Sequence, residues 1–116
     1  MTIERLHTNE RLSAAVLFDS LIFLSGQVPG DATDIESQTR QVLEKIDALL
    51  LETGAHKDSI LSATLYLKNI ERDFDAMNRV WSAWLSPGKA PARTALQAEL
   101  ARPTVLVEIT VIAVRP

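Results

Sequence analysis

The stretch T-V-L-V-E-I-T-V-I-A-V at residues 104–114 is the most strongly β-forming run in the chain. In a strand, its β-branched residues place apolar side chains on both faces, which is typical of a strand covered on both sides. Glu108 is the one charged residue in this run. A carboxylate at such a position is costly unless it is paired, hydrogen-bonded or open to a water-filled cleft.

The segment P-A-R-T-A-L at residues 91–96 holds a second unusual charge, Arg93, among small residues. A permanently charged guanidinium fork in such a setting is typical of a receptor for a planar anion. With the break A-R-P at residues 101–103 as its centre, the chain from Pro91 to Val114 predicts a C-terminal hairpin. In that hairpin Arg93 and Glu108 lie roughly 7–12 Å apart, a gap that a small ligand or a water molecule could bridge.

From the residues alone, two interpretations of Arg93 and Glu108 stay open. They could form a site for a small anion, or an ion pair that joins two subunits. Which face each side chain occupies depends on the strand register, and the sequence does not determine that register.

The composition limits the classes of function. At 116 residues and 12.8 kDa, the chain predicts one domain, residues 1–116. Its net charge of −3 and the lack of a Lys/Arg run argue against a nucleic-acid partner. The absence of cysteine excludes disulfides and thiolate metal sites. No segment approaches the roughly 18 apolar residues of a membrane helix, so we expect a cytoplasmic protein without a membrane partner.

The periodicity predicts an α+β fold with the element order βββαβαββ and a six-stranded mixed sheet. Two helices at helical spacing are expected to cover one face of that sheet. The other face then has no cover, although the last strand is apolar on both sides, and soluble monomers rarely expose such a surface. We therefore expect a homo-oligomer. The predicted strands are 2–7, 13–18, 21–25, 59–68 and the two arms of the hairpin, and the predicted helices are 34–53 and 71–85.

Three further residues are candidates for a site. Ser25 and Gly26 end a strand and offer a hydroxyl and exposed backbone amides, although the same residues also suit a simple strand end with a turn. Asn78 lies one helical turn beyond Phe74, where it could be a satisfied polar residue at the edge of the core or could face a ligand or a neighbouring subunit. The two histidines lack metal-ligand spacing, so we expect no metal.

The order of several motifs resembles the RidA/YjgF family of reactive-intermediate (enamine/imine) deaminases, and the resemblance covers nearly the whole chain. The motifs are L-I-F-L-S-G-Q-V-P at 21–29, Q-T-R-Q-V-L-E-K-I-D-A-L-L at 38–50, S-I-L-S-A-T-L-Y-L at 59–67, D-F-D-A-M-N-R-V-W at 73–81, A-P-A-R-T-A-L at 90–96 and V-L-V-E-I-T-V-I-A-V at 105–114.

The resemblance implies a chorismate-mutase-like fold and a homotrimer with clefts between subunits. It implies hydrolysis of 2-imino acids, derived from enamines such as 2-aminoacrylate, to 2-oxo acids and ammonia without a cofactor. In that chemistry Arg93 would hold the substrate carboxylate, and Glu108 would orient or activate the attacking water. Backbone groups of Gly26 and Ala95 would position the ligand, and Ser25 and Asn78 match the family's serine and asparagine.

Two positions depart from the family pattern and make the chain similar to a RutC-like sub-branch. The place of a pocket-closing tyrosine falls at Leu12, and the place of a cysteine two residues after the arginine falls at Ala95. Two alternatives to a deaminase remain. One is a non-catalytic protein that binds small carboxylates or 2-oxo acids, which needs Arg93 but not Glu108. The other is an RNA-directed or chaperone-like role, against which the acidic charge weighs.

Overall fold

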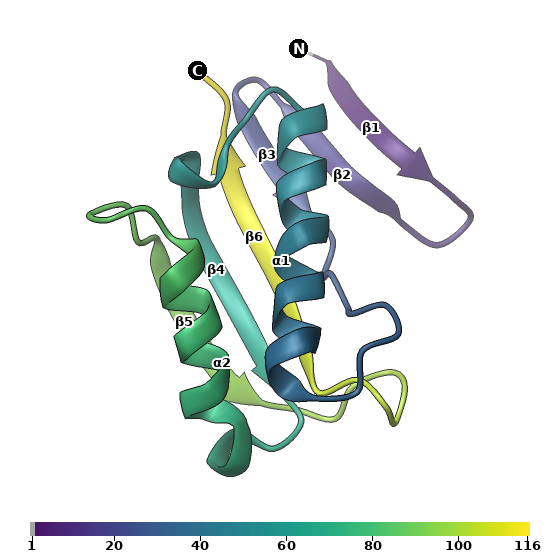
Figure 1. Cartoon of the computed structure of the whole chain (residues 1–116). Helices are drawn as coiled ribbons and strands as arrows, with labels where there is room; N and C mark the ends of the chain where they lie inside the picture. The colour runs from purple at the N-terminus through teal and green to yellow at the C-terminus, as the bar shows by residue number, and fades with distance from the viewer. Residues whose placement is uncertain (1) are drawn as a thin grey trace.

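A six-stranded sheet with both helices on one of its faces makes up the computed structural model, which describes residues 2–116 (Figure 1). The strand order is β1-β2-β3-β6-β4-β5, in which β4 and β5 run parallel and the other neighbours antiparallel. The predicted α+β architecture, element order and mixed sheet are confirmed. The elements are β1 (Ile3–Thr8), β2 (Ser13–Phe18), β3 (Leu21–Leu24), α1 (Ile35–Glu52), the short 3-10 helix η1 (Lys57–Ser59), β4 (Ile60–Leu67), α2 (Ile70–Trp84), β5 (Ala92–Gln97) and β6 (Val107–Val114).

Local signals determine where α1 begins and ends. The Asp34 carboxylate accepts a hydrogen bond of 3.0 Å from Ser37 N, which satisfies one of the amides left open at a helix start. At the other end, Gly54 has a φ of +83°, a left-handed conformation that glycine adopts without steric cost. The side of α1 that faces the sheet is fully buried, with Val42, Leu43, Ile46 and Leu50. Both predicted boundaries of this helix are confirmed.

The predicted C-terminal hairpin is wrong. β5 pairs in parallel with β4, and β6 lies between β4 and β3, so β4 separates the two arms of the expected hairpin. The physical reason is the connection through α2: a strand, a helix and a second strand form a crossover unit, which places its two strands in parallel. Residues 98–106 are also a longer connection than a tight hairpin uses.

On the face of the sheet opposite the helices, residues 2–116 form no covering layer. Along β6 the side chains alternate between buried positions under the helices, such as Ile109, and half-buried positions on the open face, such as Ile112. Phe23, whose register partner is Ile112, is 40% exposed, and Leu96 is 37% exposed.

Over residues 2–116, no helix combines the length and apolar character that crossing a membrane requires.

Candidate functional site

Arg93 and Glu108 lie on opposite faces of the sheet. Arg93 is the register partner of Ala63, which is buried beneath the helices, whereas Glu108 is the partner of Tyr66, three positions further along β4. Since side chains alternate along a strand, an odd number of positions puts them on opposite sides. Strand spacing and rise place their Cα atoms about 14 Å apart. The predicted bridging geometry within one chain is therefore wrong.

The guanidinium of Arg93 is held against the stripe of α2 that faces β5. Its Nη1 donates a hydrogen bond of 2.7 Å to Asn78 Oδ1. Its Cζ lies 5.8 Å from the ring centroid of Phe74 and 5.9 Å from that of Trp81. Cation–π contacts at this range contribute roughly 0.5–1 kcal/mol each at exposed sites. The amide and the two rings therefore orient a guanidinium that remains exposed to solvent.

Most of the hydrogen-bonding capacity of Arg93 is unused. Within the described residues, its guanidinium makes the single hydrogen bond to Asn78 and has no carboxylate within ion-pair distance. Asn78 is half-buried and accepts this bond from Arg93, and a contact of its side chain with a ligand or a neighbouring subunit stays a prediction. Its side chain positions Arg93.

The backbone of β5 adds a donor beside Arg93. Ala98 N donates to Leu67 O at 3.1 Å, so alternation along the strand directs the amides of Leu96 and Thr94 toward β4 as well. The amides of the residues between them, including Ala95, then point to the open edge of the sheet. Ala95 N–H and the Arg93 fork therefore border the same hollow, whose volume is about 520 Å³. Its lining consists of Ile70, Glu71, Phe74, Asp75, Arg93 and Ala95.

Glu108 borders a separate hollow of about 400 Å³ on the open face of the sheet, together with Gly26, Tyr66 and Thr110. Its side chain is half-buried and has no hydrogen-bond or ion-pair partner in the described part of the chain. Gly26 is required for the close approach of this carboxylate. A Cβ at Gly26 would overlap Glu108 Oε2 and would lie 2.9 Å from its Cδ.

The S-G-Q segment is fixed beside β6 by its own backbone. Gln27 N donates to Ile109 O at 2.8 Å, and Ile109 N donates back to Gln27 O at 3.1 Å. Ser25 is hydrogen-bonded within the sheet, since its Oγ donates to Ser13 O and its N donates to Ala14 O, and its contact with a substrate stays a prediction. The structure therefore brings Gly26 next to Glu108, while the donor of the Ser25 hydroxyl is used within the sheet.

The predicted residues thus separate into two groups. Arg93, Asn78 and Ala95 gather on the helix side of the β5 edge, and Gly26 and Glu108 gather on the open face. Leu12, in the turn between β1 and β2, is 50% exposed and lies at the end of the strand order opposite to β5.

Sequence reasoning also missed residues that contact these groups. Phe74 and Trp81 flank the Arg93 guanidinium. They could have been found from their spacing, because both share a helical face with Asn78. Tyr66 also lines the hollow beside Glu108. Its neighbourhood with Glu108 depends on the pairing of β4 with β6, which the hairpin interpretation had misplaced.

Comparison with known proteins finds relatives that match this chain over nearly its full length. Residues 2–115 match the family described as Endoribonuclease L-PSP. A RutC family protein of Haemophilus ducreyi is 40% identical over 112 residues, which cover 96% of this chain and 95% of that protein. The RutC family protein YoaB of Escherichia coli is 39% identical over 113 residues, covering 97% and 98%.

The solved structures agree. The crystal structure of a member of the YjgF protein family from Neisseria meningitidis matches with a TM-score of 0.97 at 43% sequence identity, covering 100% of this chain and 97% of that chain. The relatives match nearly the full length of the chain at about 40% identity, and the family model matches residues 2–115. These matches show membership of the family as well as the same fold. The chain belongs to the RidA/YjgF family, and its relatives are RutC-like.

Proposed function

We propose that the chain hydrolyses 2-imino acids to 2-oxo acids and ammonia, in a cleft that two copies build together. One copy supplies Arg93, Asn78 and the Ala95 amide. The other copy supplies Glu108 beside Gly26. Two copies are needed because Arg93 and Glu108 occupy opposite faces of one sheet, about 14 Å apart. The open apolar face supports such an assembly, since soluble monomers rarely expose a surface of this kind.

The observation that carries the proposal is that the Arg93 guanidinium is held in place while most of its hydrogen-bond donors stay free. It is oriented by Asn78 and two aromatic rings, yet most of its donors are unused and face a hollow. A planar carboxylate matches the remaining donors of the fork in a bidentate manner. The Ala95 amide at the open edge adds a further donor for the same anion. Family membership supports assigning this anion to a 2-imino acid.

The reaction needs a positioned anion, a poised water and a group that moves protons. The water oxygen bonds to the imine carbon while Glu108 accepts a proton from that water. Glu108 returns the proton to the nitrogen of the resulting carbinolamine. Glu108 then takes the proton of the new hydroxyl group and passes it to the nitrogen as the C–N bond breaks, so ammonia leaves and the carbon keeps its oxygen as the carbonyl of the 2-oxo acid.

The direct test compares wild type with Arg93→Ala on freshly generated 2-iminopropanoate and 2-iminobutanoate. Release of 2-oxo acid should fall by about 100-fold or more in kcat/KM, because two hydrogen bonds to a charged group are lost. Arg79→Ala is the matched control. Arg79 lies on α2 and pairs with Glu36 at 3.0 Å, away from the hollow, so this variant should retain wild-type turnover. Absence of turnover by folded wild type would contradict the proposed reaction.

Glu108→Ala separates hydrolysis from simple binding of a 2-oxo acid. Under the proposal, kcat falls by about 10²–10⁴-fold because the proton-transfer group is gone, while the affinity for the product 2-oxo acid stays within a few-fold of wild type. A non-catalytic binder would show no turnover in wild type and unchanged affinity in this variant. Calorimetric titration with 2-oxobutanoate beside the turnover assay distinguishes the two.

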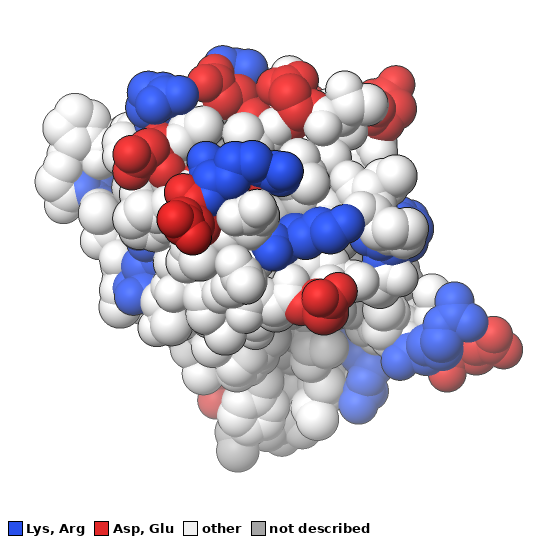
Figure 2. Space-filling view, turned by 90° about the horizontal axis from the view of Figure 1, so that it is seen from below, with Lys and Arg blue, Asp and Glu red and all other residues white. Residues whose placement is uncertain are grey.

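RNA cleavage is the second candidate, because the matching family carries the description Endoribonuclease L-PSP. Charge argues against it here. The net charge is −3, and on the face seen in Figure 2 the Lys and Arg side chains alternate with Asp and Glu instead of forming a continuous basic patch. RNA-binding surfaces without sequence preference depend on such a patch.

A further inference from the structure

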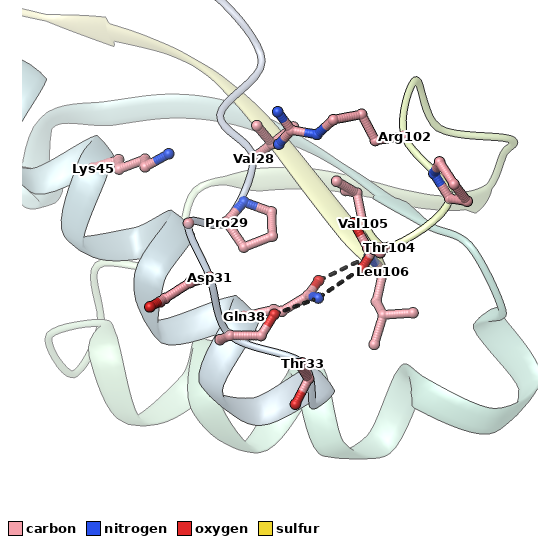
Figure 3. Close-up of a pocket in the computed structure, with 13 residues that line it drawn as sticks. Val28, Pro29, Asp31, Thr33, Gln38, Lys45, Arg102, Thr104, Val105 and Leu106 are labelled. Atoms are coloured by element: carbon pink, nitrogen blue, oxygen red, sulfur yellow. Dashed lines mark hydrogen bonds between the residues drawn. The ribbon is translucent and has the colours of Figure 1, made fainter.

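A larger hollow, of about 660 Å³, lies apart from both groups of the proposed catalytic site (Figure 3). One wall is the loop that leads from β3 to α1, residues 28–33, and the other is the loop that leads into β6, residues 102–106. Its volume falls within the range of small-molecule pockets. None of Arg93, Asn78, Ala95, Gly26 and Glu108 lines it.

The walls of this hollow are held in place by two glutamine side chains of α1. Gln38 is 1% exposed; its Nε2 donates to Ala32 O at 3.0 Å and to Thr104 O at 2.9 Å, and its Oε1 accepts from Leu106 N at 2.8 Å. Gln41 Oε1 accepts from the amides of Gly30 and Ala32. The two loops are thus tied to each other and to α1. A preformed hollow of this kind binds a ligand with little ordering cost.

Two cations extend into the hollow from different elements. Lys45 comes from α1 and Arg102 from the loop before β6, and in Figure 3 their charged ends point toward each other beside Val28. Neither forms an ion pair with any carboxylate of residues 2–116. Asp31 is the one carboxylate of the lining, and it accepts a hydrogen bond of 2.9 Å from Gln41 Nε2. Like charges directed at one space repel unless an anion lies between them.

The lining of the hollow also contains apolar residues. Val28 and Leu106 are half-buried and offer apolar surface to the hollow, and the buried Pro29 and Val105 lie behind this surface, so the lining combines two cations with apolar side chains. An arginine fork combined with a lysine point charge suits a phosphate dianion better than a single carboxylate. We propose that this hollow binds a small phosphate monoester, whose apolar body packs on Val28, Pro29 and Leu106 while Lys45 and Arg102 hold the phosphate.

Titration with phenyl phosphate at low ionic strength, followed by backbone amide NMR shifts, tests the proposal. We expect saturable binding with shifts confined to residues 28–33, residues 102–106 and the part of α1 that carries Gln38 and Lys45. Lys45→Ala and Arg102→Ala should each weaken it by about tenfold, as loss of a charged hydrogen bond does. Arg102→Lys keeps the positive charge but loses the planar guanidinium. Its affinity for phenyl phosphate should lie between those of Arg102→Ala and wild type. Benzoate, with one charge, should bind more weakly than phenyl phosphate.

The matched controls are Lys89→Ala and Arg5→Ala, which remove exposed cations outside the hollow and should leave the affinity unchanged. Arg93→Ala should also leave it unchanged, so a failure of this site and a failure of the proposed hydrolase are separate results. No saturable binding to wild type would overturn the proposal. Equal losses in the hollow variants and the controls would overturn it too, because binding would then follow net charge alone.

Discussion

At the scale of a single residue, Gly26 determines how closely the Glu108 carboxylate of the proposed site can approach the backbone. Its missing Cβ leaves room for the Glu108 carboxylate, and the backbone bridge between Gln27 and Ile109 keeps the two segments together. A glycine is needed here for close approach, since Gly26 has no positive φ. The position of the Glu108 carboxylate therefore depends on a neighbour that has no side chain.

Gly26→Ala should impair turnover far more than folding. The added Cβ forces the end of the Glu108 side chain to move, and a misplacement of about 1 Å in a reacting group can cost about 100-fold in rate. Because only a flexible side chain must shift, the loss of unfolding free energy should stay below about 1 kcal/mol. The imine assay and urea denaturation measure the two effects.

Gly30→Ala is the control for that substitution. A Cβ there meets Gln41 Oε1 at 3.5 Å, an ordinary contact, and Gly30 lies outside the Glu108 hollow. It should keep wild-type turnover. If Gly26→Ala also keeps wild-type turnover, Glu108 does not act from the position seen here.

At the scale of elements, the start of α1 carries the clearest dependence on pH. The backbone hydrogen bond from Ser37 lowers the pKa of the Asp34 carboxyl below its usual value. A carboxyl whose pKa is lower in the folded state stabilises the fold above its unfolded pKa, and this contribution is lost as the pH falls through the folded pKa. Asp34→Ala should therefore lower the unfolding temperature at pH 7 and have a much smaller effect at pH 2.

Asp34→Asn provides the comparison, because its amide oxygen can cap the helix without titrating. Thermal unfolding of all three proteins at both pH values measures the difference. An Asp34→Ala penalty that is as large at pH 2 as at pH 7 would mean that the ionised carboxylate is not what stabilises this helix end.

Helix boundaries could be predicted from the sequence because their signals are local. Asp34 and Gly54 lie within one turn of the ends that they define. The partner of β5 could not be assigned in the same way, because strand pairing joins residues far apart in the chain. Arg93 and Glu108 were recognisable as charges in unusual surroundings, but their relation to each other depended on that pairing, and the hairpin assignment placed them on neighbouring strands.

At the scale of the whole molecule, the two halves of the proposed site face away from each other. Arg93 lies on the helix side of the β5 edge, Glu108 lies on the open face, and Leu12 lies toward the β1 edge. A single copy has no route to bring Arg93 and Glu108 to one substrate without breaking the sheet. Packing of one copy's β5 edge against another copy's open face would bring them together and would cover the exposed Phe23 and Leu96.

The most direct test uses mixed oligomers of two inactive variants. Arg93→Ala and Glu108→Ala subunits, each with a different tag, are co-expressed, and complexes that carry both tags are assayed with 2-iminobutanoate. If the site is shared, some clefts combine an intact Arg93 from one copy with an intact Glu108 from another, so the mixed complexes should regain turnover that neither parent has. Mixed complexes as inactive as their parents, beside active wild type, would contradict a site shared between copies.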